Sequence, residues 1–188
     1  MGTRFTEESQ RFRPSSKEDQ VVQKAQEHFE RTLISIQGQL AGSVAALESS
    51  YGDSELNYGE IFVRDNVPVM IYLLVQGRFA IVKQFLKVCL DLQSTSVQTR
   101  GVFPTSFVEE EGNLVADYGQ RSIGRITSVD PSLWWPILCW IYVKRSGDTD
   151  FGRSPEVQRG IQLLLDLVLH PSFEGTPVLF VPDCAFMI

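Results

Sequence analysis

The sequence has few metal-binding side chains and lacks the common nucleotide-binding and nucleophile motifs. Only three cysteines and two histidines occur among 188 residues, and His28 and His170 do not form a spaced metal-ligand pair. P-loop, dinucleotide-binding glycine and nucleophile-elbow patterns are all missing from the sequence. We therefore expect neither a metal nor a cofactor.

Basic runs and long apolar runs are also missing. The net charge is −6, which disfavours nucleic acid as a partner. The longest apolar runs, Val67–Val75 and Leu133–Val143, fall well short of the roughly 20 residues that span a membrane. No apolar signal region precedes them, and the odd cysteine count (Cys89, Cys139 and Cys184) is typical of buried, reduced thiols. These features predict a cytoplasmic protein with no membrane partner.

A mean hydropathy of −0.04 and 43% hydrophobic residues are enough for one folded domain. Residues 1–16 are polar and are predicted to be partly disordered, and residues 17–188 form the predicted domain. Apolar residues recur at helical spacing from Lys17 to Ser49, which predicts one long helix that Gly38 and Gly42 weaken in its middle.

The next helix is almost entirely apolar. Asp65 or Asn66 is predicted to cap it, Pro68 suits its first turn, and Gly77 ends it. A helix without a polar face is typical of one surrounded by protein. The helix that follows, Phe79–Leu92, carries one apolar stripe and is predicted to be half exposed.

The same order of elements then repeats. Residues 93–129 are predicted to be loops and turns that form a functional surface. Asp130 is expected to cap a second apolar helix, with Pro131 at its first position and Gly147 at its end. A half-exposed helix capped by Ser154 follows.

Alternating buried and half-buried helices predict an all-α ring of helical hairpins. Inner helices in such a ring run parallel, so their N-termini lie at one end. Asp65, Asp130 and Asp183 each precede an apolar segment and are expected to converge there. Taken singly, each aspartate is better explained as a helix cap, which contributes roughly 1 kcal/mol without any ligand.

Carboxylates beside aromatic residues and an arginine also suit a polyhydroxylated sugar, which needs hydrogen-bond acceptors and flat apolar faces. The candidates for this role are Phe62, Arg64, Asp65, Asp130 and either Trp134 or Trp135. The two tryptophans project about 100° apart on a helix, so only one can face the site and the other is expected in the core. Tyr118, Gln120 and Arg121 lie on a loop, where they form either site residues or a turn closed by side-chain hydrogen bonds. Glu109–Glu111 are predicted to be a solvated patch, and Glu60 is either a helix-dipole partner or a site residue.

Four segments resemble the alkaline/neutral invertases, the sucrose-cleaving glycoside hydrolases: "NYGEIFVRDNVPV", "LQSTSVQTRGVFPTSF", "LVADYGQRSIGRITSVDPSLWWPIL" and "LFVPDCAFMI". The resemblance implies an (α/α)6 barrel, of which this chain holds about two and a half of six helical hairpins. It also implies sucrose as substrate, glucose and fructose as products, no metal, a cytosolic location and a homo-oligomer. Phe62, Arg64, Asp65, Gln120, Asp130, one tryptophan and Asp183 match positions at which the family binds sugar.

The sequence departs from the family pattern in two places. The family motif continues beyond Ile188 into the expected general acid, so no catalytic residue is assigned here, and Cys184 stands where the family usually has glycine. The implied chemistry is hydrolysis by two carboxylates, one acting as acid. We therefore expect these 188 residues alone not to cleave sucrose. The alternatives are a non-catalytic helical-repeat binding module and a self-associating inactive remnant.

Overall fold

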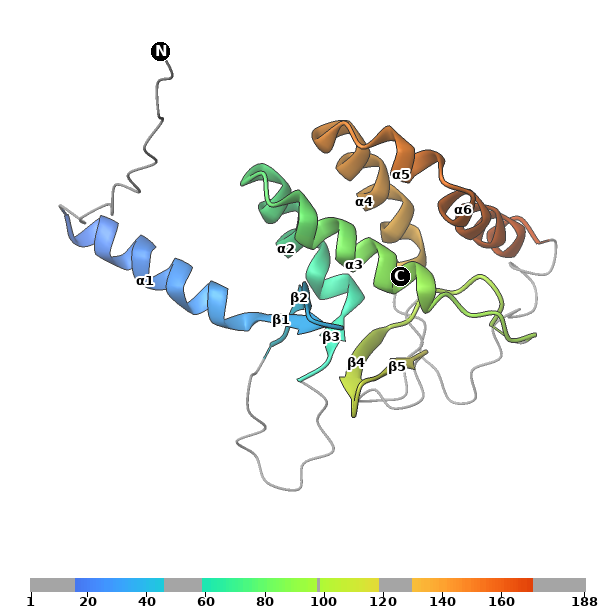
Figure 1. Ribbon diagram of the computed structural model, residues 1–188, viewed down its shortest axis with the longest axis horizontal. Coiled ribbons are helices and arrows are strands. Elements are labelled where there is room, and N and C mark those ends of the chain that lie inside the picture. Colours follow the sequence, from blue (N-terminus) through green and yellow to red (C-terminus); the bar gives the residue numbers. More distant parts are fainter. Residues whose placement is uncertain (1–15, 46–58, 98, 119–129, 171–188) are drawn as a thin grey trace, which may run out of the picture. The chain divides into compact units, whose positions relative to one another are not determined.

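The computed structural model describes residues 16–45, 59–97, 99–118 and 130–170 (Figure 1). The chain divides into two compact units, Met1–Arg31 and Thr32–Ile188. Helix α1 (Lys17–Thr32) accounts for most of the described part of the first unit and ends at the first residue of the second; none of its residues is buried. A reciprocal cap starts α1, because Ser16 Oγ accepts from the Asp19 amide and Asp19 Oδ2 accepts from the Ser16 amide, each at 3.1 Å.

The single helix predicted from Lys17 to Ser49 is wrong beyond Thr32. The chain there forms an antiparallel hairpin of β1 (Leu33–Ile36) and β2 (Gln39–Ser43). Gln37 and Gly38 form its turn with φ of 51° and 77°, the positive pair that a type I′ turn requires. The apolar spacing of this stretch is compatible with a helix or with strands. The turn at Gln37 and Gly38 makes the strands possible, because it reverses the chain between them.

A second sheet corrects the all-α prediction further. It contains β3 (Ile61–Phe62), β4 (Ser106–Glu110) and β5 (Asn113–Asp117), antiparallel in that order. Glu111 (φ 52°) and Gly112 (φ 80°) join β4 to β5 by the same kind of turn. The stretch predicted as loops over 93–129 thus includes two strands, and the fold is mostly helical with two small sheets.

The remaining described helices are α2 (Val63–Val75), α3 (Phe79–Asp91), α4 (Asp130–Ser146), α5 (Thr149–Arg153) and α6 (Pro155–Val168). Several local predictions are confirmed. Gly77 follows α2 at φ 75° and Gly147 follows α4 at φ 76°, where side chains with a Cβ are strained. Ser154 caps α6 by accepting from the Val157 amide at 3.4 Å. The short helix α5, capped by Asp148, was not predicted.

The predicted start of α2 is wrong by several residues. The helix begins at Val63, so Asp65 and Asn66 lie in its first turn rather than ahead of it, and Pro68 lies inside the helix. The Val63 amide donates to the Thr105 carbonyl at 3.0 Å, so the sheet connection starts the helix earlier than an aspartate cap would. Asp130 is likewise the first residue of α4 rather than the residue before it.

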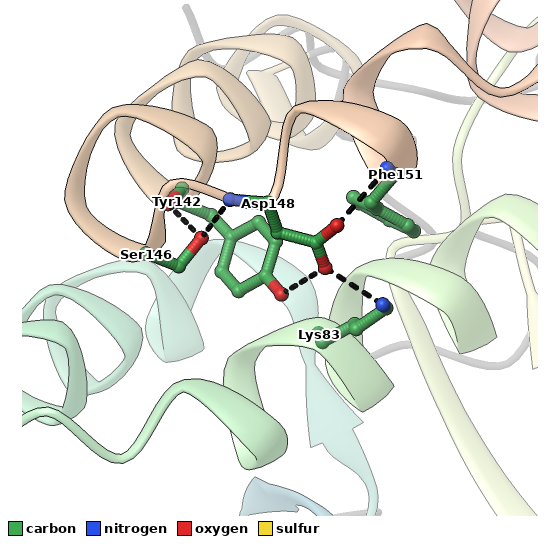
Figure 2. Close-up of polar contacts among 5 residues, drawn as sticks. All are labelled: Lys83, Tyr142, Ser146, Asp148 and Phe151. Carbon is green, nitrogen blue, oxygen red and sulfur yellow. Dashed lines mark hydrogen bonds and ion pairs between the residues drawn. The ribbon is translucent and has the colours of Figure 1, made fainter.

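Two ion pairs show that α2 and α4 run parallel, as predicted for inner helices of a ring. At their starts, Arg64 Nε lies 3.7 Å from Asp130 Oδ2. At the other end, Lys83 of α3, which follows the end of α2, donates to Asp148 just after α4 at 2.7 Å (Figure 2). Both helices therefore begin at the same end of this unit.

One flank of this helix pair is exposed. The exposed apolar residues are Ile71, Tyr72 and Val75 of α2, and Leu133, Trp134, Ile137 and Trp140 of α4. The prediction that these apolar helices are surrounded by protein on all sides is thus wrong within the described part of the chain. No helix among the described residues is long and apolar enough to cross a membrane.

Asp148 organises the end of the unit at which α4 stops (Figure 2). Its Oδ2 accepts from Lys83 Nζ at 2.7 Å and from the Tyr142 hydroxyl at 2.8 Å, and its Oδ1 accepts from the Phe151 amide at 3.1 Å. These donors hold the pKa of Asp148 below its usual value, with the Lys83 hydrogen bond the largest cause. The cluster ties α3, α4 and α5 together.

Candidate functional site

The starts of α2 and α4 bring two of the three predicted aspartates to one arginine. Arg64 Nε lies 3.7 Å from Asp65 Oδ1 and 3.7 Å from Asp130 Oδ2. The Asp130 side chain is 18% exposed and that of Asp65 is 65% exposed, so both reach solvent. The partial positive charge that the helix dipole places at the N-terminus of each helix favours negative charge there. The result is a cluster of two carboxylates and one guanidinium on rigid elements.

A pocket adjoins this cluster. It has a volume of ≈ 170 Å³ and is lined by Ser43–Ala45 at the end of β2, Glu60, Phe62, and Asp65, Asn66 and Val69 of α2. Phe62 supplies an aromatic surface to it, and the predicted site residues Phe62 and Asp65 therefore share one cavity.

Asn66 and Glu60 give this pocket a fixed wall. Asn66 is 2% exposed; its Oδ1 accepts from the Ser43 amide at 2.7 Å, and its Nδ2 donates to the carbonyls of Ser43 and Phe62, each at 2.9 Å. Glu60 is 6% exposed and its Oε2 accepts from Ser106 Oγ at 2.6 Å. Sequence reasoning missed the role of Asn66, because nothing in the sequence indicates that the hairpin end packs on α2.

The two tryptophans divide as predicted into one core residue and one exposed residue. Trp135 is 1% exposed, stacks on Phe103 at 4.8 Å between ring centroids, and donates from Nε1 to the Leu86 carbonyl at 3.0 Å. Trp134 is 39% exposed on the same helix. The indole of Trp134 is thus the one accessible to a ligand, and its contact with sugar stays a prediction.

Tyr118 is held by the backbone. Its hydroxyl donates to the Leu92 carbonyl at the end of α3, and burial raises the pKa of the phenol. This hydrogen bond joins residues 26 positions apart, so it ties the end of β5 to the end of α3 rather than closing a local turn, and the site role of Tyr118 stays a prediction. Gln120, Arg121, Asp183 and Cys184 lie outside the described residues.

One glutamate and two cysteines of the described part of the chain have structural surroundings. Glu109, predicted to be solvated, accepts from the Gln37 amide at 2.6 Å and so binds the β1–β2 turn to β4. Cys89 and Cys139 are buried free thiols, as predicted; burial raises the pKa of both, that of Cys139 to about 11. Thiols with a raised pKa are poor nucleophiles. No group of three or more potential metal-ligating side chains was found among the described residues.

Residues 25–188 match the family model of the alkaline and neutral invertases. With a mostly helical fold and two acidic helix starts at one arginine, this chain belongs to that family. It is 37% identical over 180 residues to alkaline/neutral invertase CINV1 of Arabidopsis thaliana, covering 89% of this chain and 32% of that protein. It is 36% identical over 180 residues to cytosolic invertase 1 of Oryza sativa subsp. japonica, with the same coverage.

The chain spans about a third of the length of these relatives. A further relative, neutral/alkaline invertase 1 of Oryza sativa subsp. japonica, is named mitochondrial; it is 37% identical over 191 residues, which cover 93% of this chain and 30% of that protein. Membership of the family therefore does not assign a compartment.

Proposed function

We propose that the protein acts on sucrose as an alkaline/neutral invertase, and that the starts of α2 and α4 form the sugar-binding part of its site. The observation that carries this proposal is that Arg64 joins Asp65 and Asp130, which come from two parallel helices. A single aspartate at a helix start is explained by capping. Two aspartates on one arginine, with an exposed indole one turn further along α4, are better explained by a ligand.

The chemistry of the cluster suits a sugar. Carboxylates accept hydrogen bonds from pairs of hydroxyl groups, and Arg64 keeps Asp65 and Asp130 oriented while donating hydrogen bonds of its own. Phe62 and Trp134 offer flat apolar surfaces for the C–H faces of a sugar ring. Tyr118, Gln120 and Asp183 complete the set of proposed binding residues.

The proposal assigns binding, not proton transfer, to these side chains. Glycoside hydrolysis needs two carboxyl groups on either side of the scissile bond, one protonated and one ionised. The products are then glucose and fructose, and no residue named here acts as acid or nucleophile.

We also propose that these helices belong to an (α/α)6 barrel. The parallel direction of α2 and α4 supports it, and the exposed flank with Val75, Leu133 and Trp140 is where further helices would pack. The free thiols of Cys89 and Cys139 suit the cytosol, and we expect a homo-oligomer. Cell fractionation and light scattering on the full-length protein test these two points.

Binding and turnover measurements test the function. We expect the full-length protein to release glucose from sucrose and to bind sucrose in calorimetric titration. Asp65→Asn and Asp130→Asn should each weaken binding by roughly ten-fold or more, because hydrogen bonds to charged groups are the strong ones. Asp166→Asn, an exposed change on α6, is the matched control and should bind as the unchanged protein does. Unchanged binding in both site variants would contradict the assignment.

The exposed flank favours a second candidate for these 188 residues on their own, a self-associating inactive remnant. Exposed apolar side chains on two neighbouring helices can promote association of the chain when they form a patch. Light scattering on the isolated chain should then show dimers or larger species without glucose release from sucrose. A monodisperse, non-associating chain would remove this candidate.

A further inference from the structure

The pocket beside the Arg64 cluster contains a carboxylate that the proposed sugar site does not use. Glu60 lines the pocket and is 6% exposed. Its Oε2 accepts from Ser106 Oγ at 2.6 Å, and Ser106 is fully buried on β4, where it pairs with Phe62. A neighbouring strand therefore fixes the direction of the Glu60 carboxylate before any ligand arrives.

Another part of the wall comes from the end of the β1–β2 hairpin, which was not predicted from the sequence. Ser43–Ala45 line the pocket. The Asn66 side chain fixes the backbone of Ser43: Oδ1 accepts from the Ser43 amide at 2.7 Å, and Nδ2 donates to the Ser43 carbonyl at 2.9 Å. A wall tied by a buried amide loses little conformational freedom when a ligand binds. The pocket is thus preformed.

The lining decides which ligand fits. Glu60 and Asp65 are its charged residues and none of its lining residues is cationic, while Phe62, Val44 and Val69 are apolar. Carboxylates accept from hydroxyl groups and repel a phosphate. The volume of ≈ 170 Å³ is well below the roughly 300 Å³ at which pockets for drug-sized ligands begin, so it suits a single ring.

We propose that Glu60 accepts hydrogen bonds from the hydroxyl groups of one sugar ring in this pocket, and that the pocket selects an uncharged ring over a phosphorylated one. This inference deepens the proposed function and rests on it. It adds Glu60 as a ligand-contacting residue, Ser106 and Asn66 as positioning residues, and the hairpin end as a wall that sets selectivity.

Calorimetric titration of the full-length protein with sucrose and with a sucrose phosphate tests the proposal. We expect sucrose to bind and the phosphate ester to bind at least ten-fold more weakly. Glu60→Gln, which keeps the shape but removes the charge, and Ala45→Phe, which fills the pocket, should each weaken sucrose binding by roughly ten-fold or more. Glu156→Gln and Ala80→Phe, the same changes at exposed positions of α6 and α3, should bind as the unchanged protein does.

The outcomes separate this inference from the proposed function. If Glu60→Gln does not fold, Ala45→Phe decides the question, because Ala45 is exposed and its substitution leaves the core intact. Normal sucrose binding by the folded pocket variants, or equal binding of the phosphate ester, would overturn the inference. If Asp65→Asn and Asp130→Asn still weaken binding in that case, the proposed function survives. A full-length protein that binds no sugar refutes both.

Discussion

Replacing Asp148 by asparagine tests how the helices of the second unit are held together. Asp148→Asn keeps the size of the side chain and an oxygen that can still cap α5, so the change removes mainly the charge. The charged carboxylate accepts two hydrogen bonds at Oδ2, from Lys83 Nζ at 2.7 Å and from the Tyr142 hydroxyl at 2.8 Å. Lys83 also lies 5.4 Å from the centre of the Phe151 ring, which keeps the ammonium group beside the carboxylate.

The expected loss of stability is moderate. Hydrogen bonds to charged groups contribute about 1.5–3 kcal/mol each. The side chains of Lys83 and Asp148 are 41% and 25% exposed, so solvent screens the pair and the lower end applies. We expect Asp148→Asn to lower the free energy of unfolding by about 1–2 kcal/mol, which lowers Tm by roughly 2–8 °C for a chain of this size.

The effect should depend on pH in a defined direction. The folded state lowers the pKa of Asp148, so its stabilisation is present above the unfolded value near 3.8 and is lost as pH falls through the folded pKa. Thermal unfolding followed by circular dichroism at neutral and acidic pH measures this. Asp150→Asn, an exposed change on α5, is the control. The reasoning is refuted if both variants have the same Tm at neutral pH, or if the difference grows on acidification.

Further predictions concern the tryptophans, one tyrosine and one glycine. Trp135→Ala should cost roughly 3–5 kcal/mol in urea unfolding because the ring is fully buried, whereas Trp134→Ala should leave stability within about 1 kcal/mol and weaken sugar binding. Burial is the main cause that raises the pKa of Tyr142 to about 12, so absorbance titration should show a phenol with that pKa, and this phenol should be missing in Tyr142→Phe. The neutral phenol stabilises the folded state below pH 10.0, and this contribution to the free energy of unfolding is lost as pH rises from 10.0 toward about 12. Gly101→Ala should destabilise by at least about 2 kcal/mol in urea unfolding, since φ is +92° and a Cβ would meet the Leu163 carbonyl; Gly59→Ala, with open space around it, is the control.

Features that depend on a few neighbouring residues could be predicted from the sequence. Gly77 and Gly147 end helices because a positive φ suits glycine, and Ser154 caps α6 because its hydroxyl reaches a free amide two to three residues on. The difference in burial between Trp134 and Trp135 follows from the angle of about 100° between successive residues on a helix.

The hairpin after α1 was missed because the apolar residues there, such as Leu33 and Ile36, fit a helical stripe as well as a strand. The deciding signal was the pair Gln37 and Gly38, a turn that only backbone with positive φ can form. A glycine between two short apolar stretches should therefore outweigh helical spacing in similar sequences.

The candidate site could be predicted in residue type but not in geometry. The positions of Asp65 and Asp130 beside apolar helices indicate a site, yet the approach of the two carboxylates depends on Arg64 and on the parallel packing of α2 and α4. The hydrogen bonds that Asn66 makes to Ser43 and that Glu60 accepts from Ser106 depend on strands that are distant in the sequence. Such long-range pairings leave no local pattern in the sequence.

The most direct test of the central claim is a crystal structure of the full-length protein with sucrose or glucose bound. The account predicts a sugar ring with hydroxyl oxygens within about 3 Å of the carboxylates of both Asp65 and Asp130, and Trp134 against one face of the ring. A sugar held elsewhere, with Arg64 still joining both carboxylates and no ligand beside them, would contradict it.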